Sequence, residues 1–155
     1  MNQELDDYLC TTYPKLFSER NLPMSKTCMC WGFGCGDGWF NIINQLCQNI
    51  QCHLDWKNQD GEVVPQVVVS QVKEKFGTLR FYYMGGDDII DGMVRMAESM
   101  SGVTCEGCGN IATTSEVDED GTMGWIRTEC RPCEEKRKQE QENRLAEYTI
   151  KKEMQ

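Results

Sequence analysis

Apolar side chains recur at helical spacing in the first third of the chain. Between residues 38 and 52 they return every three or four positions, which predicts an amphipathic helix with one face toward a core. Asp37 is the predicted N-cap of this helix, because its carboxylate can accept hydrogen bonds from the N–H groups of the first turn. A weaker stripe of the same period in residues 3–21 predicts a helix that is interrupted at Pro14.

A second amphipathic helix is predicted after Asp87 and Asp88, which can cap its first turn, and it should end at Gly102. The apolar positions expected to face a core are Ile89, Ile90, Met93, Val94, Ala97 and Met100. A last helix with a mostly polar surface is predicted for residues 134–155. Acidic residues lie near its start and lysines near its end, as the helix dipole favours.

Between the two core helices, residues 63–84 are predicted to form a β-hairpin, because β-branched and aromatic residues flank the turn sequence KFGT. The length of the turn determines the register. A loop of two or four residues places Lys73 opposite Arg80, whereas a loop of three residues places Glu74 opposite Arg80. Like charges that face each other are unfavourable without an anion between them. Both registers stay open at this point.

Composition and charge narrow the functional classes. The chain has 155 residues, enough for one domain or a domain with a small appendage, and its formal net charge is −9. This acidity excludes a basic surface over the whole protein, so any contact with nucleic acid would be local. The first twenty residues contain no apolar run, so we expect no signal peptide, and no stretch has the length of a membrane span.

Cysteine spacing predicts a zinc site. Ten cysteines without a secretion signal indicate a reducing compartment, where closely spaced pairs are metal ligands more often than disulfides. Two C-x2-C pairs, Cys105 with Cys108 and Cys130 with Cys133, supply the four thiolates that structural zinc prefers. Because four thiolates saturate the metal, no coordination position stays open for catalysis.

The segment between the two cysteine pairs is predicted to be a hairpin. Asp120 and Gly121 are typical of its tip, and Trp125 and Ile126 on the return strand are expected to cover the metal. The second cysteine pair runs directly into the last helix. A knuckle, a hairpin and ligands at a helix start follow one another in this order in a treble-clef zinc finger.

The glycine-rich stretch CWGFGCGDGWF (30–40) raises several alternatives. A second metal site there would use Cys28, Cys30, Cys35 and His53. However, a helix over residues 38–52 separates His53 from the stretch by roughly 20 Å, which also argues against a Cys35–His53 nucleophile pair. Cys35 before a helix start can have a lowered pKa, but a small buried cysteine in a capped tight turn is the favoured interpretation.

The hairpin offers a candidate anion-binding face. Lys73, Lys75 and Arg80 lie on one face if the register opposes Lys73 and Arg80. The aromatic side chains expected to stack against a bound ligand are Trp31, Trp39 and Tyr82. The alternative is a solvated cluster of charges.

Four stretches of the chain carry a family resemblance: MCWGFGCGDGWFNIINQLCQNIQ (29–51), VPQVVVSQVKEKFGTLRFYYMGGDD (64–88), MAESMSGVTCEGCG (96–109) and GWIRTEC (124–130). They resemble a group of small zinc-binding proteins encoded by tailed bacteriophages and prophages. Two features depart from the group: one residue and one segment. Cys133 stands where such proteins often have histidine, which is also a zinc ligand. The hairpin between the knuckles is often basic in the group but acidic here, which argues against phosphate contacts.

Together these observations predict an α+β protein, in which an antiparallel hairpin packs with helices in residues 1–101. A treble-clef-like zinc module with a C-terminal helix is predicted for residues 102–155. The resemblance implies a phage accessory protein in the cytoplasm of the bacterial host. We expect it to act by binding, in host interaction or counter-defence, on a host protein or a nucleotide-like anion, with homo-oligomers as a further possibility. The alternatives are a nucleic-acid-binding regulator that uses Lys136, Arg137 and Lys138, and an enzyme that uses Cys35.

Overall fold

The computed structural model describes residues 1–61, 63–117 and 123–153. Helices and two antiparallel two-stranded sheets are combined, as the sequence predicts for an α+β protein. The helices are α1 (Gln3–Thr12), α2 (Phe40–Gln59), α3 (Asp88–Ser101) and α4 (Arg131–Glu153). The strands are β1 (Val68–Lys75), β2 (Thr78–Met84), β3 (Thr113–Val117) and β4 (Met123–Glu129), and two 3-10 turns are η1 (Met29–Trp31) and η2 (Asp37–Trp39).

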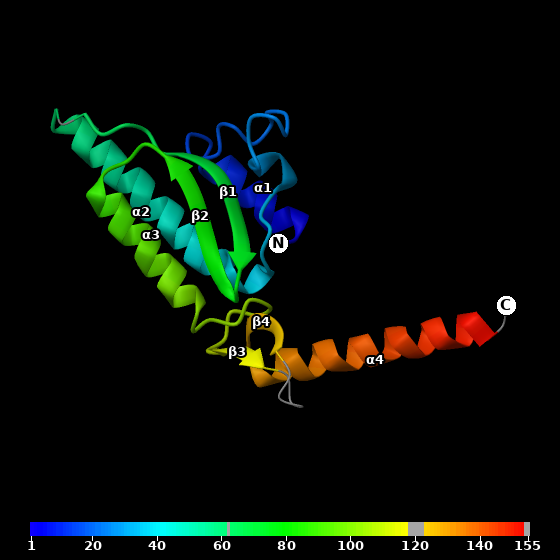
Figure 1. Ribbon diagram of the computed structural model, residues 1–155. Coiled ribbons are helices and arrows are strands. Elements are labelled where there is room, and N and C mark those ends of the chain that lie inside the picture. Colours follow the sequence, from blue (N-terminus) through cyan, green and yellow to red (C-terminus); the bar gives the residue numbers. More distant parts are fainter. Residues whose placement is uncertain (62, 118–122, 154–155) are drawn as a thin grey trace.

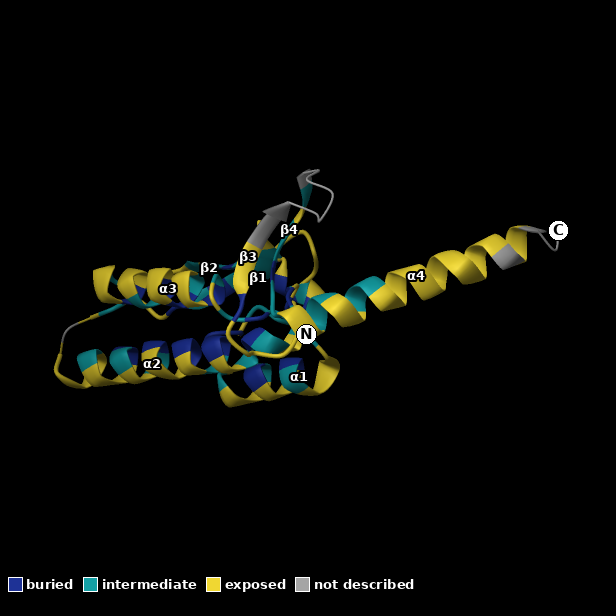
Figure 2. Cartoon of the chain, turned by 90° about the horizontal axis from the view of Figure 1, so that it is seen from below, coloured by how far each residue is buried: buried dark blue, intermediate teal, exposed yellow. Residues whose placement is uncertain are grey.

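The body of the protein is formed by the β1–β2 hairpin and the helices beside it (Figure 1). Helix α3 packs against both α2 and β2, and η1 contacts β1. The buried residues of α2 lie on its side toward the hairpin (Figure 2). Fully buried core residues come from every element of the body and include Leu9, Leu16, Met29, Trp39, Ile43, Ile50, Leu54, Val69, Val72, Leu79 and Ile90.

Helix α2 differs from its predicted bounds at both ends. It begins at Phe40 after the short turn η2, and it continues to Gln59 because the apolar spacing extends to the buried Leu54. The prediction that Asp37 caps this helix is wrong. Its carboxylate instead accepts hydrogen bonds from Asn2, through the backbone N–H at 2.7 Å and the side-chain amide at 2.8 Å. Asp37 therefore ties the start of α1 to the start of α2.

Helix α3 begins where the sequence predicts, with Asp87 as its N-cap. The Asp87 carboxylate accepts a hydrogen bond from the N–H of Ile90 at 3.1 Å. Of the six positions predicted to face the core, Ile90, Val94 and Ala97 are buried and Met93 is half-buried. Ile89 and Met100 are exposed, so that part of the prediction is wrong. The buried stripe of α3 is therefore narrower than the apolar pattern predicts.

The register of the first hairpin is the one that opposes two cations. Lys75 pairs with Thr78 and Lys73 pairs with Arg80 across a two-residue turn of Phe76 and Gly77. Both turn residues have positive φ values, 54° and 74°, which is the geometry of a type I′ hairpin turn. Beside β1, Gly34 forms an isolated parallel bridge with Lys73, so the glycine-rich stretch lies along the sheet edge.

The second hairpin and α4 follow the body (Figure 1). The predicted tip at Asp120 and Gly121 lies outside the described residues. Helix α4 begins at Arg131, three residues before the predicted start, and projects away from the body, so that it is exposed along most of its length (Figure 2). None of the helices in the described ranges combines the length and the apolar character that crossing a membrane requires.

Candidate metal centre and its surroundings

Four cysteines converge between the second hairpin and the start of α4, as predicted from their spacing. Cys105 and Cys108 lie in the turn after α3, Cys130 follows β4, and Cys133 lies in the first turn of α4. Their Sγ atoms all lie within 4.8 Å of one another. Four sulfurs at zinc–sulfur distances of about 2.3 Å would be about 3.8 Å apart. The cluster therefore needs only a small contraction to hold a tetrahedral metal ion.

The first knuckle is shaped by backbone hydrogen bonds and by glycine. The N–H of Gly109 donates to the carbonyl of Cys105 at 2.9 Å, and the N–H of Cys105 donates to the carbonyl of Asn110 at 2.7 Å. Gly109 has a φ of 79°, which a residue with a side chain adopts only with strain. Gly107 lies against Cys133, where a Cβ would be 3.3 Å from the Sγ atom. Gly107 therefore lets the two knuckles approach each other. Gly109, where a Cβ would lie 3.0 Å from the carbonyl oxygen of Gly38, lets the first knuckle approach the glycine-rich stretch.

The four thiols differ in how readily they lose a proton. Burial opposes ionisation of Cys105, yet backbone N–H groups at Cys130 and Cys108 lower the pKa of its thiol to about 7. The pKa of Cys133 is raised, first by burial and then by its hydrogen bonds to the neighbouring sulfurs. Accumulating several thiolates in one place is unfavourable without a cation. A bound divalent ion would remove this penalty and displace the protons.

Glu106, inside the first knuckle, joins the metal centre to the body. Its N–H donates to the carbonyl of Thr128 at 2.9 Å, and its carbonyl accepts from the N–H of Gly38 at 2.8 Å. Its carboxylate accepts from the N–H of Gly36 at 2.8 Å. Burial raises the pKa of this carboxyl, the Gly36 hydrogen bond lowers it, and the nearby charge of Glu74 raises it further. The residue therefore holds β4 and the glycine-rich stretch against the knuckle.

The glycine-rich stretch owes its alternating glycines to this contact. A Cβ at Gly36 would lie 2.9 Å from the Cγ of Glu106 and closer still to its carbonyl oxygen. A Cβ at Gly38 would lie 2.7 Å from the backbone nitrogen of Cys108 and closer still to the carbonyl oxygen of Cys105. Because backbone atoms cannot move aside as a side chain can, both positions require glycine. The stretch is the surface on which the knuckle rests.

Trp39 belongs to the same contact and is not a ligand-stacking residue. Its ring is fully buried, and its indole N–H donates to the carbonyl of Thr104 at 2.8 Å. The prediction that Trp39 stacks against a ligand is therefore wrong, because no face of the ring reaches solvent. The amphipathic spacing placed it correctly on the buried side of the helix, and that side packs against the residues that precede the knuckle.

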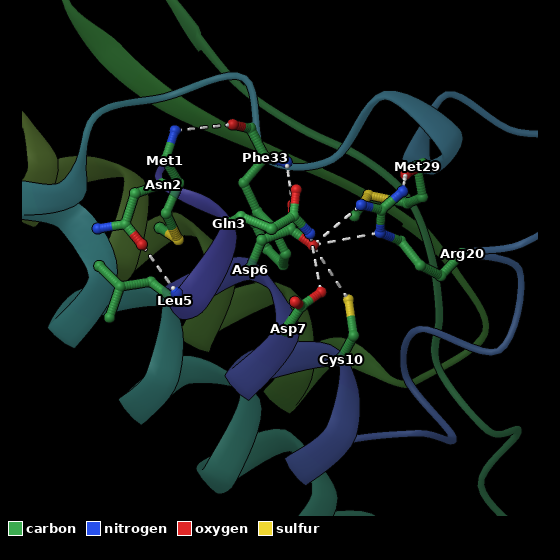
Figure 3. A network of polar contacts seen from close by, with 10 residues as sticks. All are labelled: Met1, Asn2, Gln3, Leu5, Asp6, Asp7, Cys10, Arg20, Met29 and Phe33. Carbon is green, nitrogen blue, oxygen red and sulfur yellow. Dashed lines mark hydrogen bonds and ion pairs between the residues drawn. The ribbon is translucent and has the colours of Figure 1, made fainter.

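The other end of the stretch rests on an ion pair between the buried Asp6 and the half-buried Arg20 (Figure 3). The Asp6 carboxylate accepts from Arg20 Nη2 at 3.0 Å and from the N–H of Phe33 at 3.1 Å. Arg20 Nη1 also donates to the carbonyl of Met29 at 2.8 Å. A Cβ at Gly32, whose φ is 76°, would overlap the Asp6 carboxylate. Charge pairing and glycine together bring α1 against this loop.

The cysteine nucleophile considered from the sequence lacks the required environment. Cys35 is buried, and burial raises the pKa of its thiol to about 12, so it is protonated at neutral pH. His53 lies far along α2, where its Nε2 is 2.8 Å from the carboxylate of Asp87. Within residues 1–61, 63–117 and 123–153, the four knuckle cysteines form the one group of three or more potential metal ligands. Cys28, Cys30 and Cys35 do not form a second group of this kind in the described ranges.

The predicted anion-binding residues are partly brought together. Lys73 and Lys75 line a cavity of about 450 Å³ with Trp125 of β4. The ammonium of Lys73 lies 5.5 Å from the ring centre of Tyr82. Arg80 lies opposite Lys73 in the register, and its guanidinium donates to the hydroxyl of Thr78 and the carbonyl of Leu79. Trp31 is exposed and is not among the cavity's described lining residues, which are Lys73, Glu74, Lys75, Phe76, Gly124, Trp125 and Ile126.

Two aromatic residues of this cavity were not assigned to a ligand site from the sequence. Trp125, which was expected to cover the metal, is 71% exposed and lines the cavity instead, and Phe76 of the hairpin turn is 63% exposed. A signal was present at Phe76, since a bulky residue before glycine in a two-residue turn is unusual. No signal marked Trp125, because its position depends on how the two hairpins pack.

The basic segment of α4 is largely neutralised by the protein itself. Arg137 pairs with Glu129 of β4 at 2.8 Å, and Lys138 pairs with Glu134 at 3.0 Å. Free cations are required for phosphate contacts, so two of the three residues considered for nucleic-acid binding are already engaged.

Comparison with family models, with curated proteins and with solved structures finds no match for this chain. The function must therefore be argued from the chemistry of the residues themselves.

Proposed function

We propose that the protein is a zinc-stabilised phage accessory protein that acts by binding in the cytoplasm of the bacterial host. Its expected role is host interaction or counter-defence, on a host protein or a nucleotide-like anion. The observation that carries the zinc-stabilised, non-catalytic part of the proposal is the closed set of four cysteine sulfurs, whereas the phage role rests on the sequence resemblance. Four thiolates leave a metal no open position, so the ion stabilises structure and does not activate substrate.

Zinc is the metal that this ligand set favours. Tetrahedral sites with four thiolates bind zinc or iron, and zinc keeps its charge in a reducing compartment because it has no redox chemistry. Knuckle, hairpin and helix start follow each other in the order of a treble-clef finger, which supports a structural role. The contacts of Glu106 with Gly36 and Gly38 would then transmit the rigidity of the metal centre to the body.

Binding is favoured over catalysis by the state of the candidate catalytic groups. The Cys35 thiol is buried and protonated, and His53 is engaged by Asp87. A nucleophile must be activated by a neighbouring base or by a lowered pKa; the pKa of Cys35 is instead raised by burial, and the imidazole of His53 contacts Asp87. The exposed cavity with two lysines is consistent instead with recognition of an anion.

The test uses the intact protein expressed in a panel of bacterial strains, each carrying one antiphage defence system. In at least one strain the wild type should raise phage plating efficiency. The Cys35→Ser variant should do the same, whereas a Cys105→Ser, Cys108→Ser double variant should lose both zinc and the effect. Loss of the effect in Cys35→Ser with zinc and fold retained would support an enzyme, and no effect in any strain would contradict counter-defence.

A further inference from the structure

The cavity between the two hairpins is a site with defined walls. The tip of β1–β2 forms one wall, and Gly124, Trp125 and Ile126 of β4 form the other, around about 450 Å³. This volume lies within the range of small-molecule sites, roughly 300–1,000 Å³. The walls are held together at Gly77, where a Cβ would lie 3.0 Å from the Cγ2 atom of Ile126. The hydroxyl of Thr128 also donates to the carbonyl of Gly77 at 2.5 Å.

Two lysines contribute positive charge to this cavity. In the described part of the chain, neither Lys73 nor Lys75 has an acidic group within ion-pair distance, and their ammonium groups lie over the rings of Tyr82 and Phe76. The acidic neighbour Glu74 also lines the cavity, and its carboxylate accepts from the N–H of Gly77 at 2.7 Å. Two lysines against one carboxylate give the described lining a net positive charge. Two cations left without acidic partners on a protein of net charge −9 indicate a site for an anion.

Two aromatic rings are exposed on opposite walls of the same cavity. Trp125 is 71% exposed and Phe76 is 63% exposed, and both line the cavity. Exposed aromatic side chains that adjoin uncompensated lysines form a surface on which a planar ring can stack while its phosphate meets the cations.

The backbone of Phe76 is strained in a way that packing does not require. It is the one non-glycine residue with positive φ in the described ranges, at 54°. A type I′ turn favours asparagine or glycine at this position, and a bulky residue there is an outlier. The ring contributes little to the core, because it is mostly exposed. Strain that stability does not explain is typical of ligand sites.

We infer that this cavity binds a nucleoside phosphate. The base lies against the rings of Trp125 and Phe76, and the phosphate is bound by Lys73 and Lys75. This assignment rests on the binding role proposed above and specifies its ligand class. A small nucleotide fits better than a long nucleic acid, because a polyanion would be repelled by the overall charge of −9. Arg137 and Lys138 of α4 are paired with carboxylates of the protein, so they do not offer a long nucleic acid a continuous row of cations.

Isothermal titration of the zinc-loaded full chain tests the assignment. The probes are the four ribonucleoside 5′-triphosphates and 3′,5′-cyclic AMP and GMP, with the matching nucleosides, inorganic tripolyphosphate and a single-stranded oligonucleotide as comparisons. At least one nucleotide should bind about ten-fold tighter than its nucleoside and than tripolyphosphate, since stacking adds to the phosphate contact. The inference is overturned if no nucleotide binds, if tripolyphosphate binds as tightly, or if the oligonucleotide binds more tightly than every nucleotide.

Matched variants separate the site from the rest of the surface. Trp125→Ala and Lys73→Ala should each weaken nucleotide binding by about ten-fold or more. Trp31→Ala and Lys26→Ala should leave it unchanged, because Trp31 is 72% exposed elsewhere and Lys26 is an exposed lysine outside the lining. Equal losses in both groups would show that the binding is not confined to this cavity.

Phe76→Asn provides a readout that a purely structural side chain would not give. Asparagine before Gly77 suits the type I′ turn, so the variant should melt about 2–4 °C higher. The same change should weaken nucleotide binding by about five-fold or more because one ring is lost. Unchanged binding would remove Phe76 from the site. A protein that keeps its zinc and its effect on phage plating but binds no nucleotide would overturn this inference alone. A protein without zinc would refute the proposed structural role of the metal, whatever it binds.

Discussion

A single added methyl group at Gly38 should loosen the metal centre. The Gly38→Ala Cβ would lie 2.7 Å from the backbone nitrogen of Cys108 and closer still to the carbonyl oxygen of Cys105, so the loop or the knuckle must shift. Overpacking of this kind costs about 1–3 kcal/mol. A shift would also weaken the hydrogen bond from the Gly38 N–H to Glu106, now 2.8 Å long, at a cost of about 1 kcal/mol. We therefore expect a total loss of about 3 kcal/mol.

Gly92→Ala is the matched control. Gly92 lies in α3, and an added Cβ would meet nothing within 4 Å. Replacement of a helical glycine by alanine stabilises a helix by about 0.8–1 kcal/mol, so this variant should be more stable than the wild type. Replacement of glycine by alanine should therefore lower the stability at position 38 and raise it at position 92, because the surroundings of the added Cβ differ.

Urea unfolding of the zinc-loaded proteins measures both effects, and competition with a chromophoric chelator measures zinc affinity. Part of the Gly38→Ala destabilisation should appear as weaker zinc binding. The zinc affinity should fall ten-fold for each increment of about 1.4 kcal/mol by which the change destabilises the metal-bound knuckle. If Gly38→Ala unfolded at the wild-type urea concentration and held zinc equally well, the glycine-rich stretch would not be packed on the knuckle.

Three further outcomes follow from other contacts. Asp6→Asn removes the charge that meets Arg20 and should destabilise the protein by about 2 kcal/mol, as urea unfolding would show. An effect under about 0.5 kcal/mol would contradict a stabilising, partly buried pair. Burial opposes ionisation of Asp87, but hydrogen bonds from His53 and the Ile90 N–H hold the pKa of its carboxyl below the usual 3.8. A carboxyl whose pKa is lowered in the folded state stabilises the fold above pH 3.8, and this stabilisation is lost as the pH falls through the folded-state pKa. The difference in unfolding free energy between wild type and Asp87→Asn should therefore shrink below about pH 3.8. A difference that stays constant with pH would refute the pairing. Lys138→Ala should leave zinc content unchanged, since Lys138 pairs with Glu134 on the exposed helix, and metal analysis would reveal any loss.

The parts of the fold that depend on local periodicity could be predicted from the sequence. Spacing of apolar residues located α2 and α3, and the two C-x2-C pairs identified all four cysteines of the cluster. The register of the first hairpin could not be decided, because the choice required Phe76 to accept a positive φ against its preference. Local rules predict which backbone conformation a residue prefers. They do not show where function or packing overrides that preference.

Long-range packing accounts for the remaining errors. The alternating glycines indicated a tight turn, but their partner is a knuckle about seventy residues away, which no local pattern shows. Trp39 was correctly placed on the apolar face of its helix, yet its role as a stacking surface failed because that face is covered by Thr104 and its neighbours. Trp125 was assigned to the metal for its proximity in sequence, whereas the packing of two hairpins places it in the cavity.

The metal content of the protein tests the central claim most directly. Native mass spectrometry of the reduced chain, purified without added chelator, should show one zinc ion per molecule. The ion should be lost in a Cys130→Ser variant and retained in Cys35→Ser, because only the first residue belongs to the four-sulfur cluster. A wild-type chain with less than one metal ion, or with iron in place of zinc, would contradict the structural zinc centre on which the proposed function depends.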